Sequence, residues 1–473
     1  VGTRAIRPDG VDKVTGRAMY GADLSLPGMV EGKVVRSPHA HARIISIDTS
    51  KAEALNGVTA VITAADMPVA DSKPVASGEA MINFKDLANN VLAREKALYE
   101  GQAVAAVAAK TADIAEQAAA LIVVNYEVLP HVIDVMEAIK EDAPVLHDDM
   151  FTGGVKPKPE KASNVANRVE FALGDADAGF AAADLVIERQ FTTEPVHQGY
   201  IEPHAVVADM NPDGKVDVFC SSQGHFMVRA FCSQLLHIEM SKIKVTAAEI
   251  GGGFGGKTTV YLEPLAIMLS RKSGRPVRMT MSREEVFRGS GATSGAAMTI
   301  KMGATKDGKI TGAYAELYLQ AGAFPGSPVG PAAMTAFAPY DLANVKVVGF
   351  DVVSNRQKVV AYRAPGAPIS EYGVESVVDE LASELGIDPI EIRSMNGAKE
   401  GTQAAYGVKF GTIGFQETLD AAKATEHFKT PLGPNQGRGV ASGFWFNIGA
   451  ESCAGIRINE DGSISLTEGS PDI

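Results

Sequence analysis

The sequence predicts an α+β fold made of several mixed α/β domains. Two observations lead to this class. The 473 residues are enough for two to four domains, and short runs of alternating apolar and polar residues, which are typical of strands, are interspersed with helical patterns. Hydrophobic residues make up 45% of the chain and charged residues 21%, as in ordinary globular proteins. We therefore expect domains with apolar cores of their own.

Residues 1–135 are expected to form the first domain, in which strands and a helix alternate. Strand signals lie at Val34, residues 44–45, residues 58–63 and residues 103–107. The Ala-rich stretch 111–121 predicts a helix, and Thr111 is suited to cap its first turn.

A linker is expected over residues 136–165, because the glycine pair at 153–154 and two nearby prolines cannot continue a helix or strand. Strand signals then dominate residues 166–398, the expected second domain. Within it, Asp307-Gly308 predicts the turn of a hairpin.

Two helices close this second domain. Residues 370–385 carry an apolar face, and Gly386 stands at the position after the helix where glycine is favoured. Asp388 is the expected cap of the next helix, with Glu391 completing a capping box.

Residues 399–473 predict the opening part of a third domain. Residues 455–466 predict a hairpin around a turn at 460–462. No further strand or helix follows it in the sequence, and an unpaired sheet edge is a template for pairing. We therefore expect another segment to complete this domain.

Charge and composition exclude several classes of partner. The net charge of −13, with no strongly basic segment, argues against nucleic acid. No apolar stretch approaches the roughly 20 residues that span a bilayer, and residues 1–5 contain no apolar signal core, so we expect a cytoplasmic location. Cys220, Cys232 and Cys453 are too few and too dispersed to bind an iron–sulfur cluster or zinc.

The loop at residues 250–258, with the sequence IGGGFGGKT, is the most informative feature of the chain. Its glycines lack Cβ atoms, so backbone N–H groups can approach a ligand closely. Gly251, Gly256, Lys257 and Thr258 also match the phosphate-binding loop of nucleotide hydrolases. The loop could therefore bind a nucleotide, hold another phosphate-bearing cofactor, or be a turn of no chemical interest.

The segment before the loop argues against a nucleotide site. A phosphate-binding loop follows a central, parallel and wholly apolar strand, whereas residues 242–250 alternate and predict a half-exposed strand. Asp351 is only a weak candidate for a magnesium-binding aspartate. Nucleotide hydrolysis is thus the less favoured alternative.

Several short motifs occur in order along the chain: residues 7–20, 36–42, 100–102 with 125–127, 202–204, 222–223, the glycine loop, 362–366 and 437–439. Together they resemble the large, molybdenum-binding subunit of the xanthine oxidase family of molybdenum hydroxylases. The resemblance implies an N-terminal hammerhead-like domain over 1–135, a first molybdenum cofactor-binding domain over 166–398, and an incomplete second one over 399–473. The chain is similar to the N-terminal half of a split subunit, as in nicotinate dehydrogenase-type enzymes.

The resemblance also implies the cofactor and the residues that bind it. The expected cofactor is molybdenum held by molybdopterin cytosine dinucleotide, with no direct ligation of the metal by a protein side chain. Gln223, Phe254 and Arg363 match residues at the metal and are the expected catalytic residues. The expected cofactor-binding residues are Gln223, Gly252, Gly253, Phe254, Gly255, Gly256, Arg363, Ala364 and Gly366.

The expected substrate pocket contains Thr258, Thr293, Pro365 and Trp445, although burial of aromatic residues in general favours a core position for Trp445. In purine-oxidising relatives the positions of Thr258 and Thr293 carry a glutamate and an arginine, so the neutral residues here disfavour xanthine. Carbon monoxide oxidisers have a copper-binding cysteine where this chain has Ala364. We therefore expect an N-heteroaromatic substrate, with an aldehyde or an acyl-CoA aromatic as the alternatives.

The reaction implied by the resemblance is hydroxylation with water as the oxygen source, followed by the loss of two electrons. We expect a 2Fe-2S subunit and an FAD subunit to accept them, in a dimer of the hetero-oligomer. The glutamate that acts as general base in the family belongs to its far C-terminal part. We expect a second molybdopterin-binding chain to supply it, with a cleaved or truncated end at residue 473 as the alternative. A cofactor-less assembly scaffold is a further alternative.

Overall fold

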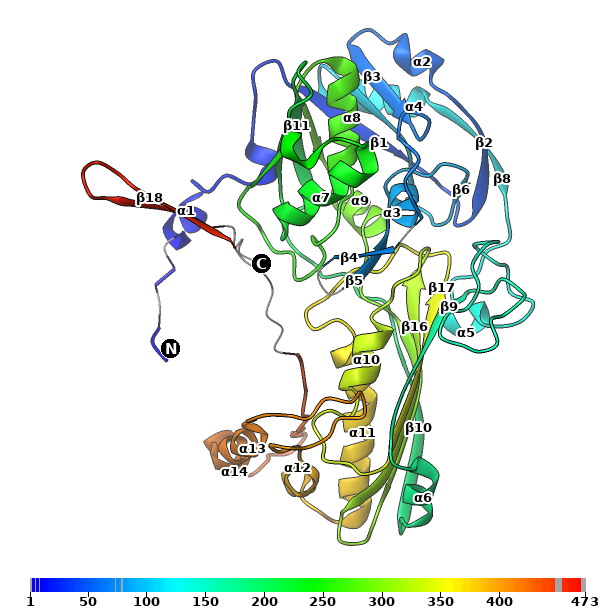
Figure 1. Cartoon of the computed structure of the whole chain (residues 1–473), viewed down its shortest axis with the longest axis vertical. Helices are drawn as coiled ribbons and strands as arrows, with labels where there is room; N and C mark the ends of the chain where they lie inside the picture. Colours follow the sequence, from blue (N-terminus) through cyan, green and yellow to red (C-terminus); the bar gives the residue numbers. More distant parts are fainter. Residues whose placement is uncertain are drawn as a thin grey trace.

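The computed structural model describes residues 2–4, 6–7, 9–72, 74–77, 80–446 and 453–468. Two large sheets dominate it, a seven-stranded sheet in one lobe and a five-stranded sheet in the other, and helices pack on both (Figure 1). The α+β class predicted from the sequence is confirmed. Of the helices in the described part of the chain, none combines the length and apolar character that a membrane span requires.

The seven-stranded sheet joins the N-terminal and middle parts of the chain. Its order is β13-β12-β11-β14-β1-β7-β3. The strands are β1 (Val30–Arg36), β3 (Val58–Thr63), β7 (Ala103–Ala109), β11 (Ala205–Met210), β12 (Val216–Cys220), β13 (Ile243–Ala247) and β14 (Val277–Thr280). Because β1 pairs in parallel with β14, the predicted first domain and the predicted first cofactor domain both contribute to this sheet.

Small side chains explain how helices cover this sheet. All seven residues of β7, with the sequence AVAAVAA, are buried. Helix α4 (Ala112–Leu121) packs on β1 and β7, and α8 (Glu263–Ser273) packs on β11 and β3, with α7 (His225–Leu236) beside it. Thr111 caps α4 by accepting a hydrogen bond from the backbone N–H of Ile114, as predicted.

Smaller elements complete the N-terminal lobe. A three-stranded sheet has the order β6-β2-β8, and β4 pairs with β5. The elements are α1 (Gly10–Thr15), η1 (Gly21–Asp23), β2 (Ala42–Asp48), α2 (Ser50–Glu53), β4 (Pro74–Ser77), β5 (Ala80–Asn83), α3 (Phe84–Val91), β6 (Lys96–Ala97), β8 (Val123–Val128), η2 (Met240–Lys242) and α9 (Arg283–Gly289).

The five-stranded sheet has the order β10-β15-β16-β17-β9. Its strands are β9 (Val165–Leu173), β10 (Leu185–Thr193), β15 (Ala296–Ala304), β16 (Ile310–Gly322) and β17 (Val345–Val353). The predicted hairpin at Asp307-Gly308 joins β15 to β16 and is confirmed. Helices α10 (Val329–Thr335) and α11 (Ala367–Leu385) pack on one face, and α6 (Ala176–Ala181) lies on the other.

Helix α11 begins three residues before the predicted start, with a proline in its first turn, and Gly386 ends it in the left-handed conformation. Asp388 caps α12 (Pro389–Asn396) by accepting from two backbone N–H groups, as predicted. The capping role predicted for Glu391 is wrong, because its carboxylate pairs with Lys423 of α13 (Phe415–Ala424).

The segment predicted as a linker is packed. It includes most of α5 (Val135–Ala138), and the buried Leu146 and Asn164 also lie within it. Asn164 accepts from the backbone N–H of Leu146 and donates to two carbonyls. This segment is therefore fixed against β16 and β17.

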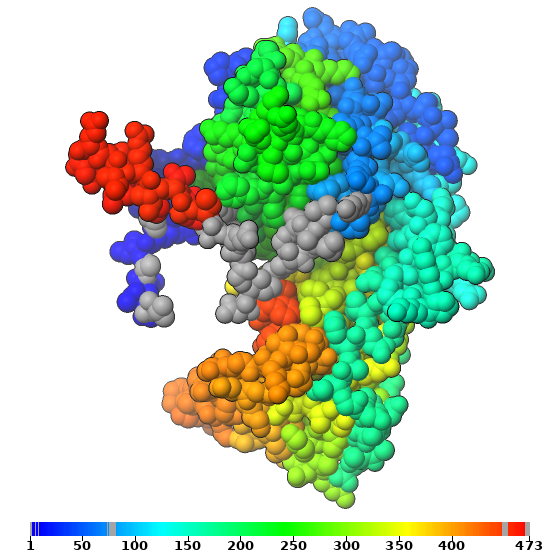
Figure 2. Space-filling model, in the orientation of Figure 1, coloured from blue at the N-terminus to red at the C-terminus, as the bar shows by residue number. Residues whose placement is uncertain are grey.

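After α14 (Glu426–Lys429), the predicted C-terminal hairpin forms from β18 (Ala454–Ile458) and β19 (Ile464–Glu468) and is confirmed. It projects from the body of the molecule (Figures 1 and 2).

Candidate functional site

The glycine loop connects β13 to α8 and has an unusual backbone conformation. Gly252, Phe254 and Gly255 have φ values of +95°, +52° and +102°. Glycine adopts such values readily, whereas for a residue with a bulky side chain they are costly. The surrounding contacts must therefore hold Phe254 in place.

Close neighbours explain the density of glycines. A Cβ atom on Gly253 would lie 2.5 Å from Gln223 Oε1, and one on Gly255 would lie 2.5 Å from the carbonyl oxygen of Ala361. A Cβ on Gly256 would lie 2.7 Å from the ring of Tyr200. The loop is thus wedged between three segments that are distant in the sequence.

Gln223 holds the loop through its amide oxygen. Oε1 accepts from the N–H of Gly255 at 2.8 Å and from the N–H of Lys257 at 3.1 Å. The backbone N–H of Gln223 donates to the carbonyl of Lys257 at 3.0 Å. Nε2 has no hydrogen-bond partner among the described residues, so it is the part of the amide that can donate to a bound molecule.

Arg363 lies against the same loop. Its backbone N–H donates to the carbonyl of Phe254 at 2.9 Å, and its side chain is exposed. Ala364 and Gly366 follow with φ values of +62° and +92°, and the half-buried Pro365 lies between them. This turn leads directly into α11, so Gln223, the loop and Arg363 are brought together as expected.

The predicted substrate-pocket residues have different surroundings. Thr258 Oγ1 donates to the carbonyl of Gly255 at 2.8 Å and is part of the loop itself. The backbone N–H of Thr293 donates to the carbonyl oxygen of Val196. The carbonyl oxygen of the preceding residue, Ala292, accepts from the backbone N–H of Val360. Trp445 is half-buried and contacts Phe446 edge to face, with ring centroids 5.2 Å apart.

An ion pair between Glu202 and Lys257 was not foreseen from the sequence. Glu202 Oε2 accepts from Lys257 Nζ at 2.7 Å and from the N–H of Gly251 at 2.8 Å. The Lys257 side chain is fully buried, and burial lowers its pKa although the carboxylate of Glu202 acts in the opposite direction. One carboxylate oxygen therefore anchors both ends of the loop. Both residues lie in sequence motifs, but their pairing depends on the fold.

A buried polar network supports the loop from behind. Tyr200 Oη lies 2.7 Å from His204 Nε2 and 3.2 Å from Ser290 Oγ, which is 3.2 Å from His197 Nε2. Burial lowers the pKa of His197 to about 4 and holds that of His204 well below its usual range. Both rings are neutral near pH 7 and serve as hydrogen-bonding groups.

The geometry of the loop does not match a nucleotide phosphate site. Lys257, which would have to reach the phosphates, is buried in its ion pair. Helix α8 begins only at Glu263, and β13 is an edge strand, half-exposed as predicted. Asp351 lies in the other sheet and accepts from the N–H groups of Gly326 and Ser327.

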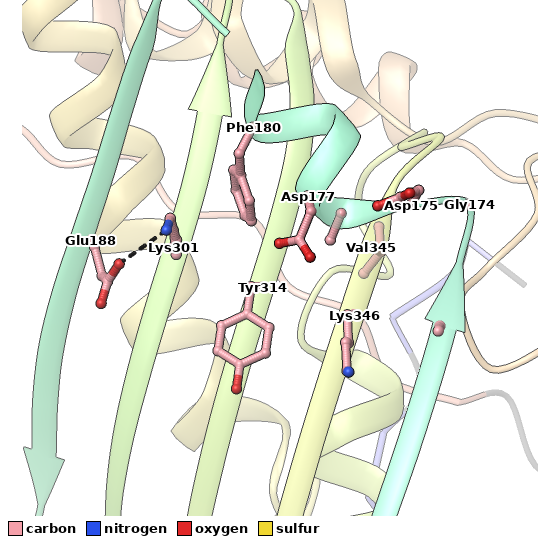
Figure 3. A pocket seen from close by; sticks show the side chains of 11 residues that line it. Gly174, Asp175, Asp177, Phe180, Glu188, Lys301, Tyr314, Val345 and Lys346 are labelled. Atoms are coloured by element: carbon pink, nitrogen blue, oxygen red, sulfur yellow. Dashed lines mark ion pairs between the residues drawn. The ribbon is translucent and has the colours of Figure 1, made fainter. Parts of the chain in front are cut away.

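A pocket of about 540 Å³ lies elsewhere, between α6 and the outer face of the five-stranded sheet (Figure 3). Its two lysines are paired. Lys301 lies 3.3 Å from Glu188 and Lys346 lies 3.8 Å from Glu170. The pocket is open and both of its lysines are already paired, so we place the candidate site at the glycine loop.

Comparisons with known proteins identify the family of the chain. Residues 157–397 match the molybdopterin cofactor-binding domain, and residues 15–130 match the a/b hammerhead domain of aldehyde oxidase and xanthine dehydrogenase. The nicotinate dehydrogenase large molybdopterin subunit of Eubacterium barkeri is 32% identical over 89% of this chain and 95% of its own length. A probable xanthine dehydrogenase subunit of Bacillus subtilis is 33% identical over 83% of this chain and 50% of its own length.

Solved structures are similar over most of the chain. The aldehyde oxidoreductase from Desulfovibrio desulfuricans matches with a TM-score of 0.85 and 26% identity, over 98% of this chain and 52% of its own. Quinoline 2-oxidoreductase from Pseudomonas putida 86 matches with a TM-score of 0.80 and 28% identity, over 89% of this chain and 54% of its own.

The matched domains and relatives define a cofactor-binding subunit of an oxidoreductase. The chain belongs to the xanthine oxidase family of molybdenum hydroxylases and corresponds to its molybdenum-binding subunit. It spans about half the length of several of these relatives, as the 50% and 54% coverages indicate, and nearly the whole length of the nicotinate dehydrogenase subunit.

Proposed function

We propose that the chain is the cofactor-binding half of a molybdenum-dependent hydroxylase or dehydrogenase. The proposed reaction adds a water-derived oxygen to an electron-poor carbon of an N-heteroaromatic compound, or of an aldehyde. The observation that carries this proposal is the arrangement of Gln223 on the loop. Its oxygen is occupied by two backbone N–H groups, which leaves its NH₂ group available to a ligand.

The residues present fit the proposed cofactor. Close approach of backbone suits a large anionic group, and Gly253 and Gly255 stand where a Cβ would clash. Arg363 adds an exposed cation beside Phe254. When bound, molybdenum with molybdopterin cytosine dinucleotide supplies two-electron redox chemistry. In the proposal, Gln223, residues 252–256, Arg363, Ala364 and Gly366 hold and orient it.

The proposed substrate class follows from the neutral side chains. Thr258 donates to the loop and offers no charge to a substrate. Thr293, Pro365 and Trp445 are the other proposed pocket residues. Relatives whose names specify nicotinate, quinoline and aldehydes support a heteroaromatic compound or an aldehyde.

We also propose that a second molybdopterin-binding chain completes the site and contributes the general base. The apolar face of the β18–β19 hairpin supports this partner. Its four members are Ile456, Ile458, Ile464 and Leu466, which are 69%, 73%, 66% and 64% exposed. The register pairs Ile456 with Leu466 and Ile458 with Ile464, so all four lie on one face. An exposed apolar patch of this kind is typical of an interface.

Further proposed partners are a 2Fe-2S subunit and an FAD subunit, in a dimer of the hetero-oligomer. Relatives named as subunits of larger enzymes support such an assembly. The free, buried thiols of Cys220 and Cys232 are compatible with the proposed cytoplasmic location.

A dye-linked oxidation assay of the complex with N-heterocycles and aldehydes tests the function. Gln223→Glu keeps the oxygen that accepts from Gly255 and Lys257 but removes the NH₂ donor. We expect kcat to fall by roughly 10²- to 10³-fold, the usual cost of one lost donor at a reacting centre, with molybdenum content retained. Unchanged turnover, or no oxidation of any compound of either class, would contradict the proposal.

A further inference from the structure

The segment from Ser442 to Phe446 lies along the first turns of α11, held by two carboxylates. The backbone N–H of Ser442 donates to Glu375 Oε2 at 2.7 Å, and the N–H of Phe444 donates to Glu371 Oε1 at 2.7 Å. Two glutamates four residues apart on a helix lie on the same face. Glu375 therefore accepts from Ser442, and Glu371 accepts from Phe444, two residues further along the segment. The segment therefore runs toward the N-terminal end of α11.

This direction leads the segment toward the candidate site. Helix α11 starts at Ala367, directly after the turn whose first residue, Arg363, hydrogen-bonds the glycine loop. Beyond Phe444 come Trp445 and Phe446, which form an aromatic cluster with residues from a neighbouring loop. The ring-centroid distances are 5.4 Å for Phe410–Phe444, 5.5 Å for Phe444–Phe446, 5.2 Å for Trp445–Phe446 and 5.9 Å for Tyr406–Phe446.

The carboxylates of Glu375 and Glu371 differ in the cations and hydrogen-bond donors that balance their negative charge. Glu375 is buried and also accepts from Arg393 Nε at 2.8 Å and from the hydroxyl of Tyr340. Arg393 in turn pairs with Asp379 at 2.8 Å. Glu371 is half-buried, and among the described residues its carboxylate accepts one hydrogen bond, from Phe444, and pairs with no cation.

We propose that Glu371 and Glu375 form a seat for residues 442–446, that Glu375 is its fixed part, and that Glu371 makes the seating of Trp445 depend on pH. A carboxylate covered by a peptide segment, close to a second carboxylate and without a cation, is stabilised in its neutral form. Protonated Glu371 can still accept from Phe444 through its carbonyl oxygen.

The sign of the pH dependence follows from the surroundings of Glu371. Burial, reinforced by the negative charge of Glu375, raises the pKa of Glu371 to about 7, against the effect of the hydrogen bond from Phe444. When the segment leaves, water solvates the carboxylate and its pKa returns toward the ordinary value. The seated state therefore binds the proton more tightly, so seating is favoured at low pH and weakens as the pH rises from the ordinary pKa of about 4.5 to about 7, above which both states are ionised.

Trp445 is the single tryptophan of the chain, so its fluorescence in the isolated full chain reports on the seat without any cofactor. We expect the emission to shift to longer wavelength between about pH 4.5 and about pH 7, with a midpoint between the ordinary and the raised pKa of Glu371. Glu371→Gln, which is neutral at every pH, should keep the low-pH spectrum throughout. The matched control is Glu384→Gln, an exposed position on the same helix, which should titrate like the wild type.

Two results would overturn the proposal: no spectral transition in the wild type, or an unchanged transition in Glu371→Gln. A second measurement does not need the variant. Amide hydrogen exchange at Phe444, corrected for the intrinsic effect of pH, should become faster relative to that at Leu381 of α11 as the pH rises from about 4.5 to about 7. Equal protection at all pH values would also overturn the proposal. A role for this seat in substrate selection rests on the proposed function, whereas the fluorescence and exchange results do not.

Discussion

Lys257 and Glu202 form a buried ion pair of 2.7 Å directly beneath the glycine loop. The same carboxylate oxygen accepts from the N–H of Gly251, so the pair fixes the start and the end of the loop at one point. The lysine that matches a phosphate-binding motif in the sequence is thus a structural anchor in the fold.

Removing one member of this pair should be costly. Lys257→Met leaves the carboxylate of Glu202 buried without its cation, and we expect the free energy of unfolding to fall by about 3–5 kcal/mol. Urea denaturation measures the change. The control is Lys140→Met, because Lys140 pairs with Glu137 on the surface with more than half of each side chain exposed, and such pairs contribute at most about 1 kcal/mol. Equal effects of the two substitutions would contradict the anchor role.

The loop should not tolerate a methyl group at Gly255. In Gly255→Ala the new Cβ meets the carbonyl oxygen of Ala361 at 2.5 Å, at a φ of +102°, so the loop must move away from Arg363. Gly407→Ala is a matched control, because its φ is +99° and nothing lies within 4 Å of its added Cβ. We expect Gly255→Ala to lose most of its bound molybdenum and to be less stable than the control by about 1–3 kcal/mol. Metal analysis and thermal unfolding test this, and retention of molybdenum would count against it.

The neutral histidines should make the fold sensitive to acid. Burial and the charge of Arg283 lower the pKa of His197 to about 4, whereas an unfolded histidine titrates near about 6.5. Between these values the unfolded state takes up a proton that the folded state does not bind, so stability falls as the pH drops from about 6.5 toward 4. His197→Asn should reduce this loss, by about 1–3 kcal/mol. Denaturation at about pH 6.5 and about pH 4.5 measures it, with the exposed His427→Asn expected to behave like the wild type.

The apolar face of the hairpin should be needed for assembly but not for folding. Ile456→Glu and Ile464→Glu place charges on that face, and we expect both to abolish co-purification with the proposed second chain. Because these residues are 69% and 66% exposed, the stability of the isolated chain should change by no more than about 0.5 kcal/mol. Ser465→Glu, on the opposite face of the hairpin, should leave the complex intact. Assembly of the isoleucine variants would rule out this interface.

Local patterns predicted much of the secondary structure. Thr111 and Asp388 cap helices as expected, because a cap depends on residues two or three positions away. Glu391 did not complete its capping box, since Lys423 competes for its carboxylate. The motif order along the chain likewise led us to expect Gln223, the glycine loop and Arg363 close together, and hydrogen bonds join both residues to the loop.

Contacts between distant residues could not be predicted in the same way. Lys257 and Glu202 are 55 positions apart, and the pairing of β1 with β14 joins segments far apart in the sequence, as in Val30 opposite Val277. Many acidic residues could have paired with Lys257, and only the fold selects one. The packing of residues 136–165 was missed for a related reason: glycine and proline indicate that regular structure ends, but not whether the segment is buried.

The central claim is that the loop at residues 251–256 holds a molybdenum cofactor. The most direct measurement is the molybdenum and pterin content of the complex purified from cells that make the cofactor, together with its affinity for magnesium-ATP. We predict about one molybdenum and one pterin per copy of this chain and no tight binding of magnesium-ATP. Tight magnesium-ATP binding without molybdenum or pterin would contradict the account.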